Sequence, residues 1–239
     1  MSTGRTFRTS LAALERAQKS PRGVSAYSRL VNRPAGRVLA AAADSLGLGP
    51  TAVTVLSGVL SLAAVVLIAV ATPSIAVGVL AAALLVGGFA LDSADGQIAR
   101  LRGTSSRAGE WLDHTLDCAI KLTLPLAVAV AWYRLDKPGG LLLVALAFQV
   151  VSVLLFFGGT LAGKLVTRAT PDGSRADERD GGRGRARSFM LLPVDHGIVS
   201  CSFVLWGWSS LFVAWYIVLL VAHVVYLAAF STSWFRELS

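Results

Sequence analysis

Long apolar runs, separated by short polar links, make up most of the chain. A helix needs about 20 apolar residues to cross the hydrocarbon core of a bilayer. Six runs meet this requirement and predict transmembrane helices at 51–71, 73–92, 113–133, 139–163, 190–209 and 211–231. The fifth run contains Asp195 and His196, which a purely structural span would avoid. The pattern predicts an all-α integral membrane protein with six transmembrane helices.

The links on one side of the predicted membrane carry most of the positive charge, as cytoplasmic loops do. The segment before the first span and the links 93–112 and 164–189 are basic, whereas the links on the other side hold only Arg134 and Lys137. We therefore expect both termini, and the polar residues between the second and third spans, to lie on the cytoplasmic side. The cell (plasma) membrane is the expected location.

An amphipathic helix is predicted ahead of the first span, over residues 24–46. Leu30, Val31 and Val38 lie on its apolar side, and arginines lie on the other. Such a helix lies at the level of the lipid headgroups, and Pro34 is expected to kink or restart it. The chain then divides into a cytoplasmic N-terminal segment with this interfacial helix (1–50), a six-helix transmembrane domain (51–231) and a short cytoplasmic tail (232–239).

Composition agrees with this interpretation and argues against nucleic-acid binding and against a disulfide or zinc framework. Hydrophobic residues make up 54% of the chain and charged residues 15%, against roughly 25% charged residues in soluble domains. The formal net charge of +8 is accounted for by basic cytoplasmic loops, so we expect no nucleic-acid partner. Cys118 and Cys201 show no spacing typical of a disulfide framework or a zinc site.

Four aspartates stand out between the second and third apolar runs. Asp92 and Asp95 are three residues apart, and Asp113 and Asp117 are four apart, so each pair shares one face of a helix. Asp92 and Asp95 are expected to end the second span, and Asp113 and Asp117 to open the third. Converging carboxylates bind hard divalent cations, and such cations hold phosphates. The aspartates therefore indicate a membrane enzyme that acts on a phosphate-linked substrate.

The spacing Asp92-x2-Asp95-Gly96-x2-Ala99-Arg100-x8-Gly109-x3-Asp113-x3-Asp117 resembles the signature of the CDP-alcohol phosphotransferase family, also called the class I CDP-alcohol phosphatidyltransferases. The resemblance implies transfer of a substituted phosphate from a CDP-linked donor to an alcohol, with release of CMP, in phospholipid biosynthesis. It implies Mg²⁺ or Mn²⁺, in two ions. The implied metal ligands are Asp92, Asp95 and Asp113, with Asp117 as general base and a further possible ligand. The residues implied to line the CDP site are Gly96, Ala99, Arg100 and Gly109.

A narrower resemblance concerns Gly103–Ser106, Gly109-Glu110 and Asp113-His114, which are similar to the choline and ethanolamine phosphotransferase branch. It singles out His114 as a second possible proton acceptor. It also implies CDP-choline or CDP-ethanolamine as donor and diacylglycerol as acceptor. The length of the chain favours CDP-diacylglycerol as the donor instead. The stretch Gly49–Thr54 is similar to the PNxxT entry to the first span of many members, which often form homodimers.

Alternatives of other classes are an intramembrane prenyltransferase, which would release pyrophosphate, and a divalent-cation transporter, which would move metal without releasing CMP. The four aspartates could also be no more than helix caps and surface carboxylates. Lys121 could bind an acceptor phosphate or simply compensate charge. Asp195 and His196 could belong to an acceptor pocket or form an ordered structural pair.

Overall fold

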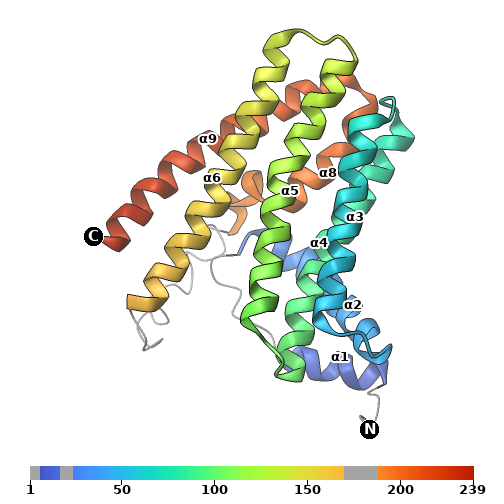
Figure 1. The fold of residues 1–239 in the computed structure, drawn as a ribbon, viewed down its shortest axis with the longest axis vertical. Helices are drawn as coiled ribbons and strands as arrows, with labels where there is room; N and C mark the ends of the chain where they lie inside the picture. The colour runs from blue at the N-terminus through green and yellow to red at the C-terminus, as the bar shows by residue number, and fades with distance from the viewer. Residues whose placement is uncertain (1–5, 17–23, 170–187) are drawn as a thin grey trace.

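Every regular element in the described part of the chain is helical. The computed structural model describes residues 6–16, 24–169 and 188–239, and these residues form no β-strand (Figure 1). The arginine-rich stretch 170–187, which contributed to the expected orientation, lies outside the described residues. The elements are α1 (Phe7–Arg16), the π-helical turn η1 (Ser28–Asn32), α2 (Arg33–Ser45), α3 (Pro50–Val70), α4 (Ile75–Arg102), α5 (Arg107–Arg134), α6 (Gly139–Ala169), the 3-10 turn η2 (Leu192–Val194), α8 (His196–Cys201), the 3-10 helix η3 (Ser202–Gly207) and α9 (Ser209–Leu238).

Five of these helices, α3, α4, α5, α6 and α9, are long and apolar enough to cross a membrane. A bent pair, Ser188–Val194 with His196–Gly207, meets the same requirement jointly, with an angle of 48° between its halves. The described part of the chain therefore has the architecture of an all-helical integral membrane protein with five or six apolar helices able to span.

The fifth predicted span differs from the continuous helix that its hydrophobicity suggested. Its two halves meet at Asp195, whose backbone is extended and whose carboxylate Oδ1 accepts the Gly197 N–H at 2.7 Å, which caps α8. A buried carboxylate needs hydrogen-bond donors, and a helix start provides free N–H groups that an unbroken helix does not. The same Asp195 that made this span irregular in the sequence is thus the point at which the helix breaks.

The second and third predicted spans continue as helices well beyond their apolar runs. Asp92 and Asp95 were expected at the end of a helix, but α4 continues to Arg102; likewise α5 begins at Arg107, before Asp113 and Asp117. Gly103 ends α4 in the left-handed conformation (φ 64°), which glycine adopts without strain. Ser106 then caps α5 by accepting the Gly109 N–H at 3.0 Å. All four aspartates are therefore held on rigid helices.

The first spanning helix, α3, packs against both α4 and α5 (Figure 1). The apolar core lies between α3, α4, α5, α6, η3 and α9, where Leu85, Val128, Phe148 and Phe203 are almost fully buried. This core fixes the relative positions of α4 and α5 and leaves their polar ends free to form a site.

The N-terminal helices cover the end of α4 that lies near the α4–α5 link (Figure 1). Asp44 of α2 is buried and accepts hydrogen bonds from the Ser10 hydroxyl at 2.5 Å and from Nε of Arg102 at 2.7 Å. Pro34 lies in the first turn of α2, directly after the π-helical turn, where a missing N–H costs little. Leu30, Val31 and Val38 of this region remain exposed.

Candidate functional site

Three carboxylates meet between α4 and α5. One carboxylate oxygen from each of Asp92, Asp95 and Asp113 lies within 4.8 Å of the other two. Carboxylate oxygens are the ligands that Mg²⁺ and Mn²⁺ prefer, and three negative charges at this separation repel one another unless a cation lies between them. The donor set therefore fits a divalent metal centre, and we call these three residues the carboxylate trio.

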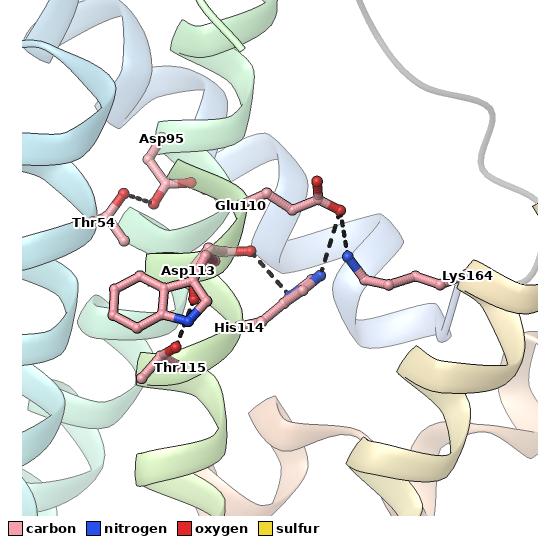
Figure 2. A network of polar contacts seen from close by, with 8 residues as sticks. Thr54, Asp95, Glu110, Asp113, His114, Thr115 and Lys164 are labelled. Carbon is pink, nitrogen blue, oxygen red and sulfur yellow. Dashed lines mark hydrogen bonds and ion pairs between the residues drawn. The ribbon is translucent and has the colours of Figure 1, made fainter. Parts of the chain in front are cut away.

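Thr54 on α3 fixes one member of the trio. Its hydroxyl donates a hydrogen bond to Oδ2 of Asp95, and both side chains are buried (Figure 2). A hydrogen bond of this kind holds a metal-binding carboxylate in one orientation. Sequence analysis gave Thr54 no role of its own, although it closes the stretch Gly49–Thr54 that resembles the family's entry to its first span.

Asp117 lies one helical turn beyond Asp113 on α5 and outside the trio. It lines a small internal cavity of about 20 Å³ together with Asp92 and His196. Lys121, one further turn along α5, is close enough to Asp117 and Asp92 for their charges to interact. Asp117 therefore lies between the trio and the Lys121 ammonium group, with room beside it for a hydroxyl group.

The four positions implied to bind CDP, namely Gly96, Ala99, Arg100 and Gly109, all line one cavity of about 540 Å³ beside the α4–α5 link. Asp95 and Asp113 of the trio line it too. A Cβ built on Gly96 or Gly109 would meet only Arg100 or Ser106, respectively, within 4 Å. The missing side chains at these two glycines therefore leave space in the cavity and do not serve close packing against another helix. The volume is in the range of small-molecule sites.

Arg33 of α2 is a second guanidinium at the trio and was missed as a site residue. It lines a polar cavity of about 250 Å³ with Arg100 and all three carboxylates of the trio. Sequence analysis placed Arg33 on the basic side of an interfacial helix, and nothing in the spacing indicated that this side turns toward α4. Burial lowers the pKa of Arg33, but arginine stays charged at neutral pH because its ordinary pKa is so high. Two guanidinium groups beside a metal site suit a diphosphate.

His114 takes part in a second polar network, with Asp113, Glu110 and Lys164 (Figure 2). Its Nδ1 lies 3.5 Å from Oδ2 of Asp113 and its Nε2 lies 3.8 Å from Oε1 of Glu110. The same Glu110 oxygen accepts a hydrogen bond from Lys164 of α6 at 2.7 Å. His114 lines the 540 Å³ cavity, as Asp113 does, whereas Asp117 lines the small internal one. The two candidate bases therefore have different surroundings.

The remaining sequence candidates separate into structural and site residues. Asp195 is buried and accepts from the hydroxyls of Ser25 and Ser28 in addition to its cap, so its oxygens are used by the fold. His196 lines the small cavity beside Asp117. Arg134 donates to the Ala69 carbonyl at 2.7 Å at the other end of α5, too far along the helix to reach the trio.

Comparison with known families agrees with the site. The family model for CDP-alcohol phosphatidyltransferase matches residues 47–194, which is more than half of the chain and includes all four aspartates. No individual curated protein matches the chain. With the carboxylate trio, the motif-lined cavity and this match taken together, the chain belongs to the CDP-alcohol phosphatidyltransferase family.

Proposed function

We propose that this protein transfers a substituted phosphate from a CDP-linked donor to an alcohol and releases CMP, at the site between α4 and α5. The family's reaction is phosphotransfer from a CDP-alcohol in lipid synthesis, with a divalent metal. The observation that supports it most directly is the carboxylate trio bordering a cavity lined by Gly96, Ala99, Arg100 and Gly109. A metal site and a nucleotide-sized space are thus adjacent.

In this proposal the trio Asp92, Asp95 and Asp113 holds the metal, as two Mg²⁺ or Mn²⁺ ions, with Asp117 as a possible further ligand. When bound, such ions neutralise the diphosphate and stabilise the charge that develops on the leaving CMP. Thr54 keeps Asp95 oriented toward the trio through its hydrogen bond. Arg100 and Arg33 bind phosphate oxygens from two sides, and the missing side chains at Gly96 and Gly109 leave room for the nucleotide.

Asp117 is the proposed general base. It is close to the trio, lines a cavity deep in the site and can take the proton of an attacking hydroxyl there. His114 is the alternative, because its ring contacts Asp113 and lines the 540 Å³ cavity. We call this cavity, which is proposed to hold the CDP group, the nucleotide cavity. The different surroundings of the two groups make them separable by substitution.

The same proposal extends to the placement of the chain in the bilayer. We count the bent pair as the fifth of six spans, with residues 51–231 as the catalytic domain, and place the trio and both termini on the cytoplasmic side of the cell membrane. The exposed Leu30, Val31 and Val38 support contact of the segment 24–46 with lipid. A homodimer remains an expectation from the family.

The test is CMP release by the purified protein in liposomes with Mn²⁺. Separate reactions would contain CDP-diacylglycerol with glycerol phosphate, inositol phosphate or serine, and CDP-choline or CDP-ethanolamine with diacylglycerol. CMP that appears with one pair and disappears with EDTA supports the proposal. Pyrophosphate release from a prenyl diphosphate, or Mn²⁺ flux with no CMP from any pair, would replace it with the prenyltransferase or the transporter.

A further inference from the structure

A further cavity, apolar and of about 240 Å³, lies between α5, α6, α8 and α9, farther from the α4–α5 link than the carboxylate trio. Most of its wall consists of hydrocarbon and aromatic side chains, among them Leu124, Phe148, Leu155, Val199, Phe203 and Phe230. We call it the apolar cavity. The family motif contributes no residue to its wall, so the proposed roles of the motif leave it unexplained.

The apolar cavity adjoins both candidate bases. Ile120 and His196 line it and also line the small cavity that contains Asp92 and Asp117. On another side its wall residue Phe156 packs edge-on against the ring of His114, with 6.4 Å between ring centroids. A ligand in the apolar cavity would therefore present one end to the reacting centre.

The charge in the apolar cavity does not suit a phosphorylated acceptor. Lys121 is the one cationic side chain among its described wall residues, and it already lies near Asp117 and Asp92. Burying a phosphate among apolar side chains is costly unless several donors or cations surround it. An acceptor with a hydroxyl at one end and an apolar body fits this wall better.

Tyr216 adds a second, independent feature. Its side chain is 3% exposed and lines the apolar cavity, yet its hydroxyl has no hydrogen-bond partner in the described part of the chain. Buried hydroxyls nearly always have a partner. A ligand that carries a hydrogen-bond acceptor within its apolar body, such as an ester carbonyl, would supply one.

The position along α5 fits the acceptor rather than the donor. Gly109 and Asp113 border the nucleotide cavity, whereas Lys121 and Leu124, two to three turns deeper, border the apolar cavity. In an in-line displacement the attacking oxygen enters opposite the leaving group, which here is CMP. The attacking alcohol is thus expected on the side of the site away from the nucleotide cavity.

We propose that the apolar cavity receives the acyl body of an acylglycerol acceptor, with its free hydroxyl at Lys121 and His196 and an ester carbonyl at Tyr216. The inference rests on the proposed function and names its acceptor class. The acceptor oxygen forms a bond to the transferred phosphorus, the bond from that phosphorus to the CMP oxygen breaks, and the hydroxyl proton passes to the base. CDP then carries the polar alcohol, not the diacylglycerol.

The first experiment compares two adjacent positions on α6. Leu155 lines the apolar cavity, whereas Leu154 is exposed on the outside of the helix. Leu155→Trp should fill the apolar cavity and Leu154→Trp should not.

Purified proteins in detergent would be labelled with a diacylglycerol that carries a photoreactive diazirine, and CMP release would be followed with CDP-choline or CDP-ethanolamine. For Leu155→Trp we expect labelling to fall and KM for diacylglycerol to rise by about tenfold, because the larger ring occupies space that the lipid would fill. KM for the CDP donor should stay unchanged, and Leu154→Trp should match the wild type.

The second experiment isolates Tyr216. A dialkylglycerol ether lacks the ester carbonyl, so the wild type should bind it about fivefold more weakly than diacylglycerol, the size of one neutral hydrogen bond. Tyr216→Phe keeps the ring and should abolish this preference while leaving the dialkylglycerol unaffected. An equal loss for both lipids would mean that the hydroxyl serves only the fold, which contradicts the proposal.

Each of the remaining outcomes decides whether an acylglycerol acceptor occupies the apolar cavity. Loss of the diazirine label on addition of CDP-diacylglycerol but not of unlabelled diacylglycerol would assign the apolar cavity to the donor's chains and overturn the inference. CMP release with glycerol phosphate that Leu155→Trp leaves unchanged would overturn it as well. Labelling needs no turnover: absence of CMP with every pair would contradict the proposed function, while labelling still decides what occupies the apolar cavity.

Discussion

The first turns and the middle of α5 border two very different environments. Toward the α4–α5 link, charged and small residues at fixed spacing surround the carboxylate trio, and the residues that line the large cavity are polar or glycine except for Pro50 and Ala99. Toward α8 and α9 the wall is mostly apolar, and its polar members come from four separate helices, namely Lys121, Ser152, His196, Tyr216 and His223. The difference suggests that the first region determines the reaction and the second determines the alcohol. Substitutions should therefore affect one property at a time.

The largest effect is expected at the carboxylate trio. Asp95→Asn or Asp92→Asn removes a charge that the metal requires, and turnover should fall by at least about 10³-fold, as for loss of a main electrostatic contributor. Mn²⁺ binding, measured by electron paramagnetic resonance, should weaken in parallel. Asp136→Asn is the matched control, because Asp136 is exposed in the turn at the other end of α5. A trio variant that binds Mn²⁺ as well as the wild type would contradict the metal assignment.

Asp117→Asn should abolish turnover to a comparable extent while leaving binding of the CDP donor largely intact. Asparagine keeps the shape of the side chain but cannot accept the proton. Donor binding by isothermal titration and CMP release in single-turnover reactions would separate the two properties. His114→Asn serves as the paired variant. If Asp117→Asn retains wild-type turnover and His114→Asn does not, the base is His114.

A smaller effect is expected at Thr54. Thr54→Val keeps the volume but removes the hydrogen bond to Asp95, so the apparent Mn²⁺ affinity should fall by about 10- to 100-fold, the usual range for such supporting partners. Saturating Mn²⁺ should restore most of the turnover. Thr123→Val is the control, because its hydroxyl bonds only its own helix at Ala119. Loss of turnover that excess metal does not restore would mean that Thr54 contacts substrate.

Arg33→Gln should raise KM for the CDP donor by about tenfold, the loss of one charge-assisted hydrogen bond to a phosphate. Binding of diacylglycerol should not change, because Arg33 lines the polar cavity at the trio and not the apolar cavity. Arg29→Gln, on the same N-terminal segment but outside the wall of that cavity, is the control. Equal effects of the two substitutions would indicate a general role in membrane attachment.

The smallest catalytic effect is expected at Asp195. Asp195→Asn weakens the hydrogen bonds from Ser25 and Ser28 and should destabilise the fold by about 1–3 kcal/mol, while turnover per folded molecule stays near the wild-type value. Thermal unfolding in detergent and active-site titration would measure the two quantities separately. A loss of turnover with no change in thermal stability would show that Asp195 belongs to the reacting centre.

Much of the region around the trio could be predicted from the sequence, because most of the residues that form it lie close together along the chain. Spacing singled out the four aspartates, the family resemblance predicted which three bind metal and which four positions line the CDP site, and hydrophobic runs located the helices. The helix ends were harder to place, since α4 and α5 continue as helices through polar residues. Arg33 and Thr54 reach the site through tertiary packing, which spacing along one chain does not reveal.

The apolar cavity could not be predicted at all. Its wall draws on residues from Ile120 to Trp234, and apart from Lys121 and His196 nothing in the sequence distinguishes them from other residues of apolar helices. Tyr216 and His223 gave no signal for the same reason. Chain length favoured CDP-diacylglycerol as the donor, whereas the shape and charge of the apolar cavity favour a lipid acceptor. The acceptor class is thus a property of packing between helices rather than of any motif.

The link between Asp195 and the N-terminal segment also bears on how the protein is made. A segment that carries Asp195 and His196 near its start inserts less readily on its own than a fully apolar one, because a charged residue within a nascent span raises the free energy of insertion. The donors that satisfy this carboxylate, Ser25 and Ser28, are synthesised some 170 residues earlier. We therefore expect stable insertion of the fifth segment to depend on its packing against the N-terminal segment, so that assembly of the helices is complete only when these two segments meet.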